Sequence, residues 1–176
     1  PPENQANLSA TIHRALELGI SHIETARGYG TSEAQLAPVL QKIPREQFIL
    51  QTKVAPQSDP DEFEKIFRTS LSRLCLPWVD LLSLHGINNR ELLEWSLRPG
   101  GCLDRARKWQ KEGLCRWVGF STHGTPELVE EIVSGGRFDY VNLHWYYIFQ
   151  EHTASLAAAQ KNDMGVFIIS PNDKGG

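Results

Sequence analysis

Four side chains that can donate, accept or hold protons stand near the ends of the first three strands expected from the sequence. Glu24 and Tyr29 flank the point where a short apolar run gives way to a turn that carries two glycines. Lys53 and His85 end the next two apolar runs. Proteins built of repeated strand–helix units place their active sites at the carboxyl ends of their strands. The pattern therefore predicts an active site with acid–base groups at these positions.

Helix start signals and apolar runs divide the chain into alternating elements. Ser32 followed by Gln35 is a capping-box pattern and predicts a helix from Ser32, and Asp59 before Pro60 marks another helix start. Strands are expected at residues 20–25, 47–53, 79–85, 116–121, 138–144 and 165–170. Helices are expected at residues 7–18, 32–42, 59–74, 91–96, 102–112, 125–135 and 152–163.

This uninterrupted alternation indicates a parallel sheet covered by helices, either an open doubly wound sheet or a closed barrel. No GxGxxG turn follows a strand, which argues against a dinucleotide-binding open sheet. Polar residues also close every expected strand, as a barrel active site requires. They are Glu24, Lys53, His85, Ser121, His144 and Ser170. We therefore predict an α/β fold of the (β/α)8 TIM barrel type, in a single domain over residues 1–176.

The sequence accounts for about six strand–helix units, whereas a closed barrel of this type has eight. The first and last strands are therefore expected to be missing, and the chain is expected to be part of a longer protein. Residues 20–25 and 165–170 should then face each other across a gap. Because unpaired strand edges attract other strands, self-association through the open edges is a further expectation.

Composition excludes several classes of function. The 176 residues are 40% hydrophobic and carry a formal net charge of −3, so the chain has no basic field for nucleic acid. The three cysteines show no CxxC spacing and are expected to be reduced thiols. No apolar run is long enough to cross a bilayer, and no signal peptide is recognisable. These features predict a cytoplasmic protein without membrane or nucleic-acid partners.

Several motifs resemble those of the aldo-keto reductases. The segments ETARGYG, QTK and DLLSLH carry Tyr29, Lys53 and His85 in the order of that family's catalytic aspartate, tyrosine, lysine and histidine, with Glu24 at the aspartate position. The segments GFS, VN and ISP are similar to the family's GVS, VNQ and YSP. The resemblance covers nearly the whole chain, and the order of its motifs makes it specific.

The resemblance implies reduction of an aldehyde or ketone by hydride transfer from NADPH or NADH. Tyr29 would be the general acid, and the Lys53 ammonium would stabilise the phenolate left behind. Glu24 would orient Lys53, and His85 would donate a hydrogen bond to the substrate oxygen or relay its proton. The alternative is that these residues have no catalytic role. Glu24 and Lys53 would then form an ordinary ion pair, and Tyr29 would be a solvated loop residue.

The resemblance also implies further contacts to the cofactor. Cofactor-binding residues would be Ser121, Thr122, Asn142 and Ser170. From their positions in the sequence, His144 and Trp145 after the fifth strand are expected to line the substrate pocket, and Arg27 between Glu24 and Tyr29 is expected to attract an anionic substrate. Helix capping by Ser121 and Thr122, packing by Trp145 and simple solvation of Arg27 remain alternatives. His123 is expected to be a loop residue without a role.

The sequence departs from the family pattern at three positions. Glu24 replaces the aspartate, Ile169 replaces an aromatic residue that stacks on the nicotinamide, and Leu143 replaces a glutamine that binds its carboxamide. In this the chain resembles a divergent branch in which some members carry a cysteine-rich iron–sulfur extension, which residues 1–176 do not contain. An alternative consistent with these departures is that the chain is a module that senses a nicotinamide cofactor and turns over little substrate.

A metal-dependent barrel hydrolase is a third possibility. His85, His123, His144 and Glu24 could meet at the barrel mouth and bind zinc. However, no His-x-His stands on the first strand, and a zinc site would leave Tyr29 and Lys53 unexplained. The sequence therefore predicts no metal.

Overall fold

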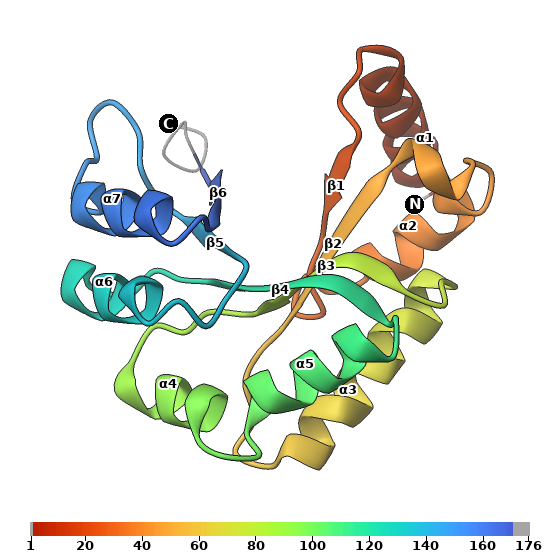
Figure 1. The fold of residues 1–176 in the computed structure, drawn as a ribbon. Coiled ribbons are helices and arrows are strands. Elements are labelled where there is room, and N and C mark those ends of the chain that lie inside the picture. The colour runs from red at the N-terminus through yellow and green to blue at the C-terminus, as the bar shows by residue number, and fades with distance from the viewer. Residues whose placement is uncertain (1, 171–176) are drawn as a thin grey trace.

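Six parallel strands form one curved sheet in a computed structural model that describes residues 2–170 (Figure 1). They pair in the order β1-β2-β3-β4-β5-β6, so each strand lies beside its predecessor in the sequence. The sheet curls into part of a (β/α)8 barrel, which confirms the predicted fold class. The strands are β1 (His22–Glu24), β2 (Ile49–Val54), β3 (Val79–Leu84), β4 (Cys115–Ser121), β5 (Tyr140–Leu143) and β6 (Gly165–Ile168).

Helices cover the convex face of this sheet (Figure 1). The helix between β2 and β3 begins where Asp59 accepts a hydrogen bond from the Asp61 amide, and Pro60 is its first residue, as predicted. The helices are α1 (Pro2–Glu17), α2 (Ser32–Leu40), α3 (Pro60–Leu74), α4 (Arg90–Leu97), α5 (Cys102–Lys111), α6 (Pro126–Ser134), α7 (Thr153–Lys161) and the 3-10 turn η1 (Arg45–Gln47). None of the helices formed by residues 2–170 has the length and apolar character needed to cross a membrane.

Some local predictions were wrong. Helix α1 begins at Pro2 rather than near residue 7, and η1 ends at Gln47, which was expected to open the second strand. The capping box also does not form, because the cap position is Thr31 and its side chain makes no capping bond. The Ser32 hydroxyl instead pairs with Thr25 Oγ1 at 2.8 Å, which ties the start of α2 to the end of β1.

Alternate side chains along the strands point to opposite faces, and the two faces differ in chemistry. Leu50, Leu82 and Val141 are fully buried in the apolar core between sheet and helices. Several of the intervening positions carry polar side chains. Gln51 Nε2 of β2 donates to Asn142 Oδ1 of β5 at 2.9 Å, although these strands are not neighbours. Such a bond is possible only across the concave interior, so the polar positions line the inside of the barrel.

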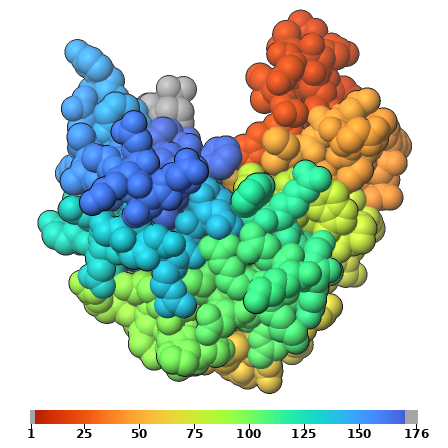
Figure 2. All heavy atoms as spheres, in the orientation of Figure 1, coloured from red at the N-terminus to blue at the C-terminus, as the bar shows by residue number. Residues whose placement is uncertain are grey.

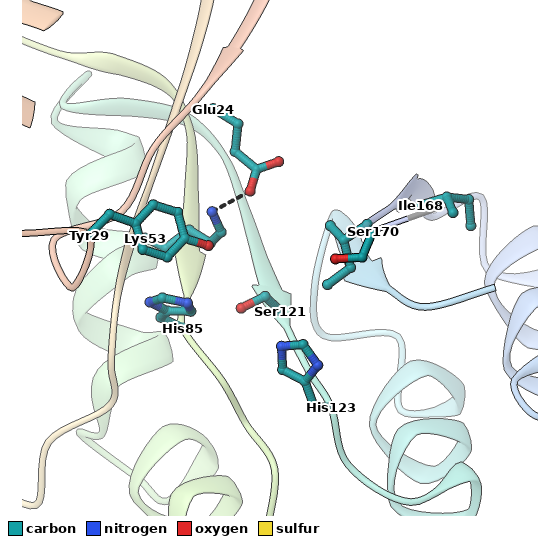
Figure 3. A pocket seen from close by; sticks show the side chains of 9 residues that line it. Glu24, Tyr29, Lys53, His85, Ser121, His123, Ile168 and Ser170 are labelled. Atoms are coloured by element: carbon teal, nitrogen blue, oxygen red, sulfur yellow. Dashed lines mark hydrogen bonds and ion pairs between the residues drawn. The ribbon is translucent and has the colours of Figure 1, made fainter. Parts of the chain in front are cut away.

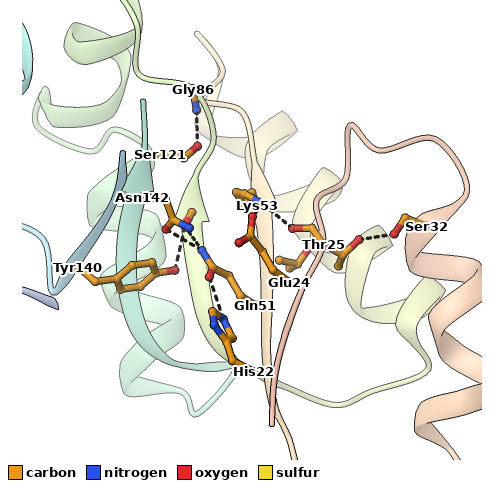
Figure 4. A network of polar contacts seen from close by, with 12 residues as sticks. His22, Glu24, Thr25, Ser32, Gln51, Lys53, Gly86, Ser121, Tyr140 and Asn142 are labelled. Atoms are coloured by element: carbon orange, nitrogen blue, oxygen red, sulfur yellow. Dashed lines mark hydrogen bonds and ion pairs between the residues drawn. The ribbon is translucent and has the colours of Figure 1, made fainter. Parts of the chain in front are cut away.

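A buried hydrogen-bond network fills this interior (Figure 4). The Gln51 amide links His22 Nε2 at 3.1 Å with the Ser83 hydroxyl at 2.9 Å, and Ser83 pairs with Tyr140 OH at 2.9 Å. Gly119 makes room for the Tyr140 ring, since a Cβ at position 119 would lie 2.6 Å from two ring carbons. The network therefore depends on the absence of a side chain at this point of β4.

The half-barrel is open between its outer strands β1 and β6. Figure 2 shows a notch between the N-terminal and C-terminal parts of the chain. The rings of His22 and Phe167 approach to 4.6 Å between centroids, so side chains from the two outer strands are in contact. Apolar side chains near the edges are exposed, among them Ile20 (58%) and Ile168 (38%). Self-association through these edges stays a prediction.

Gly119→Ala should destabilise the fold. The added methyl group would also lie 2.5 Å from the Tyr140 carbonyl oxygen, and overpacking of this kind costs about 1–3 kcal/mol. Urea unfolding monitored by circular dichroism would measure the loss. Gly28→Ala is the matched control, because nothing lies closer than 4.0 Å to its Cβ position. Equal stability of the two variants would show that Tyr140 can move away without cost.

Candidate active site

Backbone pairing beyond β1 positions Tyr29 over the end of β2. The Thr25 amide donates to the Gln51 carbonyl and the Arg27 amide donates to the Lys53 carbonyl, both at 2.9 Å. The chain then turns, and the Tyr29 amide donates to the Ala26 carbonyl at 3.0 Å. Extension of the strand pairing therefore fixes the loop that carries the phenol.

Lys53 lies at the centre of the site (Figure 3). It is 2% exposed, and its ammonium forms an ion pair with Glu24 and donates to the Thr25 carbonyl at 3.0 Å. The Lys53 Nζ atom lies 4.7 Å from the centre of the Tyr29 ring. A buried ammonium needs such partners, because its desolvation is costly without them.

His85 completes the group from the end of β3. Its ring meets the Tyr29 ring edge to face, with 5.6 Å between centroids and an angle of 84°. Burial, followed by the nearby Lys53 charge, lowers the pKa of His85 from 6.5 to about 4. Glu24 opposes this shift and His123 adds to it. His85 is therefore neutral at pH 7, with one N–H group available as a donor.

These four side chains line one wall of a cavity of about 440 Å³. Ser121 and His123 form its floor, and residues from β6 and the segment after it form the opposite wall (Figure 3). That wall consists of Ile168, Ile169 and Ser170. The structure thus brings together all four residues expected to be catalytic and two of those expected to bind cofactor.

The other two expected cofactor residues lie outside this cavity. Thr122 is fully buried, donates to the Ile87 carbonyl at 2.8 Å and accepts from the Gly124 amide at 2.9 Å. Asn142 is also fully buried and accepts from Gln51. Its Nδ2 atom has no hydrogen-bond partner among the residues described.

The three residues expected in the substrate pocket are dispersed. The closest approach of Arg27 to Glu33 is 3.9 Å, and Trp145 Nε1 donates to Thr153 Oγ1 at 3.0 Å. His144 lines a second cavity, where its Nε2 pairs with His123 Nδ1 at 2.9 Å. None of the three lines the cavity of Tyr29 and Lys53.

His123 is a cavity residue that the sequence analysis placed in a site only in the zinc alternative. It was expected to be a loop residue, and it lines both this cavity and the second one. The available signal was its position just after β4, two residues beyond Ser121 at the strand's polar end. Its pairing with His144 depends on the neighbouring loop and is not visible in either segment alone.

The donor set of the cavity fits the nicotinamide end of a dinucleotide. Ile168 and Ile169 offer an apolar surface for a flat ring, and Ser121 and Ser170 offer hydroxyl groups beside it. Among residues 2–170, no group of three or more His, Cys, Asp or Glu side chains is arranged to hold a metal ion.

Comparisons with solved structures find the same architecture. The aldo-keto reductase AKR11C1 from Bacillus halodurans superposes with a TM-score of 0.82 at 20% identity, over 97% of this chain and 59% of that one. An aldo/keto reductase from Brucella melitensis gives 0.74 at 26% identity, over 94% of this chain and 63% of that one. The chain thus spans less than two thirds of either protein.

Sequence comparisons point the same way. An uncharacterized oxidoreductase of Caenorhabditis elegans, ZK1290.5, is 33% identical over 78 residues, which are 43% of this chain and 24% of that protein. The sequence profile of the aldo/keto reductase family matches residues 2–176. With a match of this extent, and with the half-barrel and its strand-end residues in place, the chain belongs to the aldo/keto reductase family.

Proposed function

We propose that this chain carries the catalytic part of an oxidoreductase that reduces an aldehyde or ketone to an alcohol. The observation that supports this most directly is the convergence of Glu24, Tyr29, Lys53 and His85 on one cavity. A reduced nicotinamide cofactor, NADPH or NADH, supplies the hydride when bound. The small-molecule carbonyl compound and the cofactor are the proposed partners.

Tyr29 supplies the proton. As hydride reaches the carbonyl carbon, negative charge develops on the carbonyl oxygen, and the phenol transfers its proton to that oxygen. The Lys53 ammonium, 4.7 Å from the ring centre, stabilises the phenolate that forms. Proton uptake from solvent then restores the phenol.

Glu24 and His85 position the reacting groups. Glu24 and the Thr25 carbonyl hold the Lys53 ammonium at one place, so that its charge stays beside the phenol. His85 is neutral and can donate one hydrogen bond to the substrate oxygen without competing to protonate it. Ser121 and Ser170 are proposed to contact the cofactor from the floor and the far wall.

Tyr29→Phe should lower carbonyl reduction in the full-length protein by at least about 100-fold, because it removes the proton donor and little else. Cofactor affinity, measured by fluorescence titration, should change by less than about twofold. Tyr147→Phe makes the same chemical change at a side chain that is 91% exposed, and should have no effect. Unchanged reduction by Tyr29→Phe would refute the assignment. Cofactor binding without turnover in the wild type would favour the sensing module.

Glu24→Asp should reduce kcat by about 10- to 100-fold. The shorter side chain withdraws the carboxylate from Lys53 by about 1.5 Å, and displacements of about this size are costly in an active site. Steady-state kinetics would measure the effect. Glu24→Gln keeps the side-chain length and removes the charge, so it distinguishes the effect of length from the effect of charge on kcat. Full activity of Glu24→Asp would show that the site tolerates an aspartate placed as in the family pattern.

His85 should make the fold less stable at acid pH. Its pKa is about 4 in the folded chain against 6.5 for an ordinary histidine, so between these values only the unfolded chain binds the proton. The stability of wild type relative to His85→Gln should therefore fall as pH drops from 6.5 to about 4. Melting temperatures across this range test the prediction, with exposed His13→Gln as control. Parallel curves for wild type and His85→Gln would contradict it.

A further inference from the structure

The loop between β1 and α2 presents Tyr29 to the cavity in a position that is 49% exposed. The phenol ring contacts the His85 ring and the Lys53 ammonium (Figure 3). Its place therefore depends largely on the backbone that carries it. That backbone forms two turns that share Tyr29. The Tyr29 amide donates to the Ala26 carbonyl, and the Ser32 amide donates to the Tyr29 carbonyl, both at 3.0 Å.

Glu33 follows the second of these turns and reaches back to the first. It lies in the first turn of α2 and is 1% exposed. Its Oε1 atom accepts a hydrogen bond from the Thr52 hydroxyl at 2.8 Å, and its Oε2 atom lies 3.9 Å from Arg27 Nη1. Thr52 precedes Lys53 on β2, and Arg27 belongs to the turn that leads to Tyr29. One carboxylate thus contacts both the strand that carries the ammonium and the turn that carries the phenol.

The burial of this carboxylate is costly for the stability of the fold. The Glu33 Oε2 atom has no hydrogen-bond partner among the described residues, since the Arg27 guanidinium is beyond hydrogen-bond distance. Apolar side chains of similar volume in place of a buried ion pair are often as stable or more stable. The other buried residues of α2 are apolar, namely Leu36, Ala37, Val39 and Leu40. A costly polar group in such a layer is expected where function requires it.

We propose that Glu33 is a positioning residue for the reduction and acts through Arg27 on the loop of Tyr29. Its charge holds the Arg27 guanidinium, and this fixes the turn against β2, where the Arg27 amide donates to the Lys53 carbonyl at 2.9 Å. Loss of the charge would let the phenol move relative to the Lys53 ammonium without removing either group. The inference rests on the proposed function for the role of Tyr29, and on the contacts of Glu33 for the ordering of the loop.

The single-turnover rate at which the full-length protein reduces propanal, a small uncharged aldehyde, tests the effect on catalysis. Glu33→Gln keeps an acceptor for Thr52 but removes the charge that holds Arg27, and it should lower this rate about tenfold, because small displacements are costly in an active site. Arg27→Met should lower the rate equally, and the double variant should lose no more, because both changes remove one interaction. Glu131→Gln is the matched control, since it removes the charge of an exposed ion pair with Arg90 and should leave the rate unchanged. Additive losses would overturn the proposal.

Amide hydrogen exchange, measured by NMR, tests the ordering of the loop whether or not the protein reduces propanal. In Glu33→Gln the Arg27 and Tyr29 amides should exchange at least about tenfold faster than in the wild type, whereas the Thr25 amide should not change. Thr25 is the internal control, because its amide also pairs with a β2 carbonyl at 2.9 Å but lies ahead of the turn. Equal acceleration at all three amides would show that Glu33 contributes only to overall stability, and it would overturn the proposal.

An apolar replacement separates positioning from stability. Glu33→Met combined with Thr52→Val removes the carboxylate together with its hydroxyl partner, so the melting temperature should equal or exceed that of the wild type. The rate of propanal reduction should nevertheless fall at least about tenfold when it is measured well below that temperature. A wild-type rate in this double variant would overturn the proposal.

Failure of this proposal and failure of the proposed function are distinguishable. Faster exchange at Arg27 and Tyr29 in Glu33→Gln, in a protein whose wild type does not reduce propanal, would support the ordering of the loop and refute the function. Reduction of propanal by the wild type, with neither the rate nor the exchange altered in Glu33→Gln, would support the function and refute the role of Glu33.

Discussion

The buried ammonium of Lys53 is the constraint on which the site depends. A cation that is 2% exposed is tolerated only if carboxylate and carbonyl oxygens replace the lost water. Glu24 and the Thr25 carbonyl do so, and both lie at the end of β1. The same charge contributes to keeping His85 neutral and lies 4.7 Å from the centre of the Tyr29 ring. The buried Lys53 charge thus constrains the relative positions of the Glu24 carboxylate, the Tyr29 phenol and the His85 imidazole.

The sheet can bury this charge because its two faces have different chemistry. Leucine and valine side chains on the convex face pack under the helices and provide the hydrophobic stabilisation. The concave face is then free to carry polar groups, provided that they satisfy one another. Gln51 does this for His22, Ser83 and Asn142, and Gly119 provides the space that the Tyr140 ring needs. The interior network thus forms a polar floor below the site.

The site is assembled from loops that extend the strand pairing. The backbone bond from Arg27 to Lys53 continues the β1–β2 ladder, and the bond from His85 to Val54 does the same for β2 and β3. The side chains proposed to be catalytic are therefore held on backbone that is hydrogen-bonded to the sheet. The loop after β5 is organised differently, by the tight turn between Tyr146 and Phe149.

The sequence by itself determined the element order and the fold class, and it indicated that Glu24, Lys53 and His85 would lie at one edge of the sheet. These follow from local signals, because hydrophobic periodicity identifies strands and helices, and parallel strands carry their terminal residues to one edge. Strand ends were predicted to within two residues, and the remaining differences arise because fraying and loop pairing depend on neighbours. The capping box at Ser32 failed because Thr25, seven positions earlier, takes its hydroxyl.

Only the tertiary structure decided which polar side chains face the cavity and which satisfy the interior. Thr122 and Asn142 stand at strand ends as Ser121 does, yet they bond to Ile87, Gly124 and Gln51. His123 became a shared wall of two cavities because the loop after β5 brings His144 against it. Apart from the local Gly124–Thr122 bond, these pairings join residues 21 to 91 positions apart, and no local pattern encodes them. The Gln51–Asn142 bond follows from the curvature of the sheet, which sets side chains of non-neighbouring strands against one another across the interior.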